Sequence, residues 1–197
     1  MARKVPHLYL MAIKAELAAA FSETFDNVGE TEIIRDDFIS FMDKHPFVDG
    51  IVSPANSFGL LTGGFDKALR DYFGKPLQEA VQHKILTEWF GEQTVGTSMV
   101  VEIPGWPGKK LLHTPSMRTP SAILDGQVVY LCMRSALMAA IRSGIAFLVV
   151  PAFGGGTGCV PEKVIAYNMR AAYDQIISQL ENPHMVTFRT AGKVFRR

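Results

Sequence analysis

The sequence predicts an α/β protein, a three-layer α/β/α sandwich whose central sheet is mixed but mostly parallel. Strand-like and helix-like segments alternate along the chain, which is typical of that class. The run 145–150, Ile-Ala-Phe-Leu-Val-Val, is apolar throughout, as in a strand that helices cover on both faces. A chain of 197 residues suits one sheet with one set of covering helices, and we expect a single domain over 1–197.

The first half of the chain opens with an apolar run that Lys14 and Glu16 interrupt. The interruption argues against a leader peptide and favours a strand followed by a helix. Leu17, Phe21 and Phe25 then recur at helical spacing. We predict strands at 7–13, 31–35 and 49–53, helices at 14–25 and 38–43, a long loop at 53–64, and helical structure from 65 to about 90.

The second half contains the turn Pro-Gly-Trp-Pro-Gly at 104–108, which predicts a hairpin between two strands. Its last helix has an apolar stripe that includes Ile165, Met169 and Ile176. We predict strands at 96–103, 110–115 and 145–150, helices at 126–143 and 161–180, and an edge strand around 185–189 in an otherwise unassigned tail, 183–197.

Charge and composition exclude several classes of protein. Twenty basic and nineteen acidic residues give a net charge of +1, and the basic cluster Lys193, Arg196 and Arg197 is small, so specific nucleic-acid binding is not predicted. Cys132 and Cys159 form neither a disulfide framework nor a metal-binding pattern. We therefore expect a reducing compartment, the cytoplasm, with no metal and no cofactor. No apolar stretch is long enough for a membrane span.

Two glycine-rich loops follow predicted parallel strands, at 53–64 (SPANSFGLLTGG) and 151–161 (PAFGGGTGCVP). In open α/β sheets, ligands bind beyond the carboxyl ends of the strands, where such loops lead into helix N-termini. Glycine lets backbone N–H groups approach an anion closely, and the helix N-terminus adds its own unpaired N–H groups. Two facing loops would suit a diphosphate. Neither loop has the residues of a P-loop or of a dinucleotide fingerprint.

Three segments resemble the macro domain family. Residues 49–57 (DGIVSPANS) with 63–69 (GGFDKAL) are similar to its D-A-I-V-N-A-A-N-S … G-G-G-V-D-x-A-I signature. Residues 151–161 correspond in place and length to its second, phosphate-holding loop, and 35–38 (RDDF) resemble its G-D-I segment. The resemblance runs over roughly residues 7–180 and implies the macro fold and binding of ADP-ribose or a derivative.

The resemblance also implies roles for particular residues. Asp37 would accept a hydrogen bond from the adenine amino group, with Phe38 beside the ring, and Asn56 would lie near the distal ribose. Asp66 matches the acidic residue of the hydrolytic members, so Asn56 and Asp66 are the implied catalytic pair. The implied ligand-binding set is Asp37, Phe38, Ala55, Asn56, Gly63, Gly64, Phe65, Gly154, Gly155, Gly156, Thr157, Gly158 and Cys159.

The chain departs from the family pattern at three places. Ser53 stands where the first Asn of the signature is usual, Thr62 where a further glycine is common, and Gly156-Thr157-Gly158 where the family has a Gly-Ile-Phe/Tyr-type sequence. The aromatic residue that often covers the distal ribose is therefore missing. The strand–helix unit at the N-terminus and the segment 114–120 (TPSMRTP) are similar to a bacterial or phage-type branch. These departures bear on catalysis more than on binding.

Each candidate residue has a purely structural alternative. Asp66 is either a general base or a helix-start acid that interacts with the helix dipole, and Asn56 either contacts ligand or ties its own loop together. Asp37 competes with Asp36 for the adenine contact and also suits a helix N-cap. Cys159 is either a nucleophile or a loop residue, with His113 the histidine placed near a strand end.

Three functions follow from these alternatives. The first is an ADP-ribosyl hydrolase that acts at the distal ribose without a metal. The second is a module that binds ADP-ribose without turning it over, and a third reading keeps the scaffold but changes the nucleotide. The expected partner is ADP-ribose or an ADP-ribosylated substrate in each of the first two.

Overall fold

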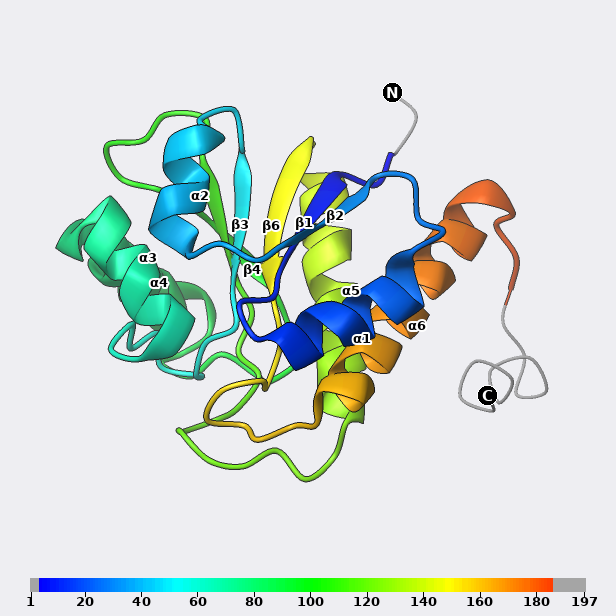
Figure 1. Ribbon diagram of the computed structural model, residues 1–197. Coiled ribbons are helices and arrows are strands. Elements are labelled where there is room, and N and C mark those ends of the chain that lie inside the picture. The colour runs from blue at the N-terminus through cyan, green and yellow to red at the C-terminus, as the bar shows by residue number, and fades with distance from the viewer. Residues whose placement is uncertain (1–3, 186–197) are drawn as a thin grey trace.

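A six-stranded sheet forms the centre of the molecule in the computed structural model, which describes residues 4–185 (Figure 1). Its strand order is β2-β1-β6-β3-β5-β4, and every neighbouring pair is parallel except β4 with β5. The mixed, mostly parallel sheet of the prediction is thus confirmed. The strands are β1 (His7–Met11), β2 (Thr31–Ile34), β3 (Gly50–Ser53), β4 (Met99–Glu102), β5 (Lys110–His113) and β6 (Phe147–Pro151).

Helices cover both faces of this sheet, as the apolar strands require. In Figure 1, α1, α5 and α6 lie on one side of the sheet and α2, α3 and α4 on the other. The three-layer sandwich is therefore confirmed. The helices are α1 (Ala15–Phe25), α2 (Phe38–Lys44), α3 (Gly64–Phe73), α4 (Lys75–Glu88), α5 (Gln127–Arg142) and α6 (Glu162–Glu181). None of those found within residues 4–185 has the length and apolarity to cross a bilayer.

Alternate residues of each central strand enter two separate cores. In β3, Val52 packs in the core under α1, α5 and α6, while Ile51 packs in the core under α2, α3 and α4. Both side chains are fully buried. This period-two alternation fixes which face every strand residue serves. Ser53, two residues after Ile51, therefore faces the same layer as Ile51.

The helical structure predicted for 65 to 90 is broken at Gly74 into α3 and α4. Gly74 has a φ of 91°, in the left-handed region that glycine adopts without strain, and its N–H bonds to the carbonyl of Arg70. Pro76 follows at the start of α4, where proline is tolerated. The other predicted elements are present with ends shifted by a few residues. The edge strand predicted around 185–189 lies, apart from Met185, outside the described residues.

The parallel strands end together at one edge of the sheet. Three long connections leave that edge: 54–63 after β3, 114–126 after β5 and 152–161 after β6. They meet at the bottom of the view in Figure 1. Because β3 lies between β5 and β6, its loop is flanked by the other two.

Substitution of Gly50, the first residue of β3, tests how tightly this strand is packed. A Cβ atom there would lie 2.5 Å from Ile145 Cγ2 and 2.9 Å from Leu148 Cδ1, and both neighbours are buried. Gly50→Ala is expected to lower the free energy of unfolding by about 1–3 kcal/mol, measured by chemical denaturation. Gly29→Ala is the control, because no heavy atom lies within 4 Å of its added Cβ. Equal effects of the two substitutions would contradict the packing argument.

Candidate functional site

A cavity of about 330 Å³ lies at the carboxyl edge of the sheet. The three long connections and the first turn of α3 form its walls. Apart from Asp66, the described residues that line it are uncharged. They are Pro54, Ala55, Asn56, Leu60, Thr62, Gly63, Gly64, Phe65, Asp66, Ser116, Met117, Pro120, Pro151, Ala152, Gly154, Gly156, Thr157 and Gly158.

Asn56 organises the first of these walls through its side chain. Its Nδ2 donates to the carbonyl of Leu60 at 2.9 Å, and its Oδ1 accepts from the backbone N–H groups of Phe58 at 3.1 Å and Leu60 at 3.3 Å. The amide thus holds the loop in a tight turn, as Asn side chains often do. The hydrogen bonds of Asn56 therefore support the first alternative, in which it ties its own loop together. Asn56 also lines the cavity, where its remaining surface can contact a ligand.

Asp66 lies in the first turn of α3 and is 9% exposed. The hydroxyl of Ser53 donates a hydrogen bond of 2.7 Å to its Oδ1. Burial raises the pKa of Asp66 to about 7, and the Ser53 hydrogen bond opposes part of that rise. A carboxyl group with a pKa near neutrality can both accept and release a proton at the pH of the cell, which suits a general base. The position at the helix start also allows the dipole interaction.

The strand next to Ser53 carries part of a buried polar pair, His113 and Gln93, that the sequence did not reveal. Ser53 is in register with His113 of β5, and His113 and Gln93 are fully buried. His113 Nδ1 lies 2.6 Å from Gln93 Oε1, while Gln93 Nε2 faces the Thr97 hydroxyl and the His113 carbonyl, both at 3.1 Å. Because Oε1 only accepts, Nδ1 carries the ring proton. Nε2 is therefore a bare acceptor, with no hydrogen-bond partner in the described part of the chain.

The ring of His113 is neutral because burial lowers its pKa to about 3. The ring is bonded to Gln93, and it does not line the cavity. Cys159, by contrast, is exposed, and its Sγ lies 3.6 Å from the carbonyl of Thr157. The thiol and this imidazole therefore have different local partners, and the loop reading of Cys159 is the one that its contact favours.

The second glycine-rich loop is held by its own backbone. Gly154 has a φ of 77°, and its carbonyl accepts from the N–H of Val160 at 3.1 Å. A Cβ at Gly158 would lie 2.8 Å from the backbone of Gly154, so the loop closes on itself at this point. Of the predicted residues here, Gly154, Gly156, Thr157 and Gly158 line the cavity, whereas Gly155 and Cys159 do not.

The segment 114–126 is a third wall, and its role as a wall was not predicted from the sequence. Backbone hydrogen bonds tie it to both glycine-rich loops, from Ser57 N to Met117 O at 3.1 Å and from Ile123 N to Gly158 O at 2.8 Å. Ser116, Met117 and Pro120 line the cavity. Arg118 forms an ion pair with Glu92 at 2.7 Å.

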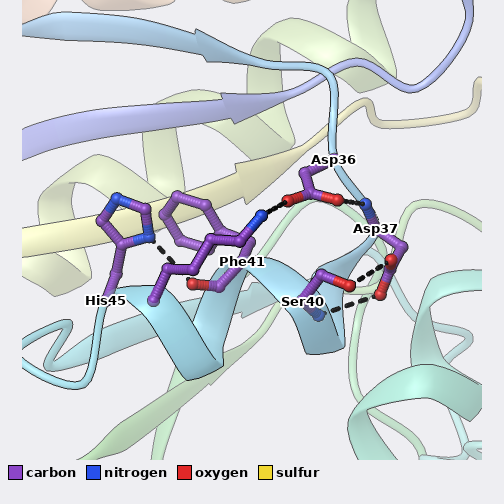
Figure 2. A network of polar contacts seen from close by, with 6 residues as sticks. Asp36, Asp37, Ser40, Phe41 and His45 are labelled. Carbon is purple, nitrogen blue, oxygen red and sulfur yellow. Dashed lines mark hydrogen bonds and ion pairs between the residues drawn. The ribbon is translucent and has the colours of Figure 1, made fainter.

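The corner before α2 holds the two acids considered for adenine (Figure 2). Asp37 is the N-cap of α2: its carboxylate accepts from the Ser40 N–H at 3.0 Å and from the Ser40 hydroxyl at 2.6 Å. These hydrogen bonds lower the pKa of Asp37. Asp36 accepts from Lys44 Nζ at 2.6 Å and from the Asp37 N–H at 2.9 Å. Asp37 is thus the N-cap, while Asp36 forms an ion pair with Lys44.

Phe65 connects this corner to the cavity. Phe38 is buried and does not line the cavity, but its ring packs edge-on against Phe65 with centroids 5.1 Å apart. Phe65 does line the cavity. Asp37 and Phe38 therefore lie next to the lining residues rather than among them.

Substitution of Asp66 tests its buried carboxyl group. The folded-state pKa of about 7 lies above the ordinary value of 3.8 for an aspartate, so the folded protein binds this proton more tightly than the unfolded chain. The stability that Asp66 contributes is complete below about pH 4 and is lost as the pH rises through 7. Asp66→Asn should therefore gain stability over wild type by up to about 1.4 kcal/mol per pH unit in this window and then level off. Denaturation curves from pH 4 to 9 measure the difference, and a constant difference would contradict it.

Comparison with known proteins agrees with this geometry. A protein of Aquifex aeolicus is 30% identical over 122 residues, which are 61% of this chain and 70% of that protein. The Oceanobacillus iheyensis macrodomain with ADP has a TM-score of 0.57 at 22% identity, covering 65% of this chain and 68% of that chain. A variant of that macrodomain with ADPR has a TM-score of 0.55 at 22% identity, covering 68% and 72%.

The model of the macro domain family matches residues 52–169, which are more than half of the chain. The matched segment begins in β3 and ends in α6, so it includes all three connections that line the cavity. This chain therefore belongs to the macro domain family.

Proposed function

We propose that this chain binds ADP-ribose or an ADP-ribosyl derivative in the cavity and hydrolyses the bond at the distal ribose. The observation that carries the proposal is a buried carboxyl group with a pKa near neutrality, Asp66, in the wall of a cavity that two glycine-rich loops enclose. The Oceanobacillus iheyensis macrodomain, which has the same fold, was solved with ADP and, as a variant, with ADPR.

Backbone groups are suited to hold the diphosphate. The N-cap of α3 is Gly63 and that of α6 is Pro161, and neither helix start has a side-chain cap hydrogen bond. The N–H groups of these first turns are thus available to an anion, with the positive ends of both helix dipoles behind them. Gly63, Gly64 and Gly156 leave room for close approach, because a Cβ at any of them would meet no heavy atom within 4 Å.

Asp66 supplies the chemistry. In its ionised form it accepts a proton from the water that attacks the anomeric carbon of the distal ribose, the bond to the ADP-ribosylated group breaks, and that group leaves with the bonding electron pair. The ligand phosphate and the wall shaped by Asn56 position the water, so the scheme depends on orientation in a preorganised site. Binding without turnover is the alternative, and two departures from the family pattern favour it: Gly158 stands where the aromatic residue is usual, and Ser53 replaces the first Asn of the signature.

Catalysis is tested by release of ADP-ribose from modified protein, nucleotide and small-molecule substrates. Asp66→Ala should lower the rate by about 10²- to 10⁴-fold, the usual contribution of a general base, while calorimetry still detects ADP-ribose binding. Asp71→Asn is the matched control, because Asp71 is an exposed acid on the same helix that pairs with Lys67. If wild type bound ADP-ribose but released it from no substrate, the binding module would be supported instead of the hydrolase. If wild type did not bind ADP-ribose, both functions would be overturned.

The salt dependence of binding tests how the diphosphate is held. None of the described residues lining the cavity is Lys or Arg, so the ligand charge meets backbone dipoles rather than mobile cations. Salt screens exposed charge pairs far more than enclosed dipoles. The dissociation constant for ADP-ribose should therefore change by about twofold or less between 50 and 500 mM NaCl, on the order expected for weak screening. A steep loss of affinity with salt would point to cationic contacts instead.

A further inference from the structure

We propose that Ser53 is a positioning residue: its hydroxyl holds one carboxylate oxygen of Asp66, so that the other oxygen remains for the attacking water. The inference rests on the proposed function and extends it to a residue that departs from the family pattern. Ser53 does not line the cavity, and it acts only through Asp66.

The position of the hydroxyl is fixed by the sheet. Ser53 is the last residue of β3, is fully buried, and lies in register with His113 of β5. Its carbonyl accepts from the N–H of Thr114 at 2.9 Å, which extends the pairing of β3 with β5 by one further bond. A donor at the end of a central, paired strand has little freedom to move. Ser53 Oγ therefore presents its proton to Asp66 Oδ1 from a rigid base.

Asp66 makes this one side-chain hydrogen bond within residues 4–185, so Oδ2 stays unoccupied by protein donors. Asp66 lies in the first turn of α3 and lines the cavity. With Oδ1 engaged by Ser53, Oδ2 is the oxygen that is left for a water or a ribose hydroxyl. Rotation of the carboxyl group would break the 2.7 Å bond, so the orientation is held.

A hydroxyl suits both protonation states of its partner. It donates to the carboxylate, and it can accept from the carboxylic acid that forms when Asp66 takes up a proton. The contact therefore persists through the proton transfer. His113 lies on the same face as a neutral ring with Nε2 bare, so it offers no second donor that would compete for Asp66.

Among the described residues, no charged group near Asp66 stabilises its ionised form in place of the Ser53 hydroxyl. The titratable side chains on the elements around it are Lys67, Arg70, Asp71 and Tyr72 on α3, Asp43 and Lys44 on α2, Lys110 and His113 on β5, Arg118 and Asp125 in the third wall, and Lys75, Glu79, His83, Lys84 and Glu88 on α4. The shift in the pKa of Asp66 arises from burial, which raises it, and from the Ser53 hydrogen bond, which lowers it. Ser53 is thus the group that favours the ionised form.

The test compares Ser53→Ala and Ser53→Cys with the control Ser57→Ala. Ser57 is also buried, but its Oγ has no hydrogen-bond partner in the described region. Ser53→Ala should lower kcat by about 10- to 100-fold, as loss of a hydrogen bond to a charged group does, while the ADP-ribose dissociation constant stays near wild type. The acid limb of the kcat profile should move to higher pH. Ser53→Cys, with a weaker donor, should be intermediate.

A direct titration separates this inference from the proposed function. Carboxyl ¹³C NMR of Asp66 in the full chain reports its pKa without any turnover, and that pKa should rise in Ser53→Ala, rise less in Ser53→Cys and stay unchanged in Ser57→Ala. These shifts would support the role of Ser53 even if wild type hydrolysed no substrate, which would remove the hydrolase proposal alone. If Asp66 titrated alike in all variants, or if the folded Cys variant matched the control, the positioning role would be overturned.

Discussion

The pairing of β3 with β6 on one side and with β5 on the other is the constraint on which the site depends. Because all three strands are parallel, the connections that follow them leave the sheet at one edge and form three walls of one cavity. The same pairing buries Ser53 at the end of β3 and places its hydroxyl under the head of α3. Sheet register, loop position and the ionisation of Asp66 are thus consequences of one arrangement.

Much of this arrangement could be predicted from the sequence. The doubly buried strand 145–150 required helices on both faces, and the two glycine-rich segments after β3 and β6 marked the edge of the sheet where the cavity lies. Asp66 was identifiable through its place in a motif. These signals are local or periodic, so they survive in a single chain without knowledge of its contacts.

Other features depend on contacts between distant segments, and the sequence carries no local sign of them. Gln93 lies in the connection between α4 and β4, and only the fold brings it against His113, twenty residues away. The bonds of Asn56 to its own loop and the capping of α2 by Asp37 were each one of two readings that the residue type allowed. The break at Gly74 depended on whether a glycine took a positive φ, which composition alone does not decide.

The rim of the cavity is joined by main-chain hydrogen bonds, from the first loop to the third wall and from the third wall to the second loop. Groups present in almost every residue therefore join the three walls, and these bonds need no particular side chain at the positions that make them. Such a rim places weak demands on residue identity during divergence. Proteins that agree at only 22% of positions share this fold, in which main-chain bonds of this kind can form whatever the side chains are.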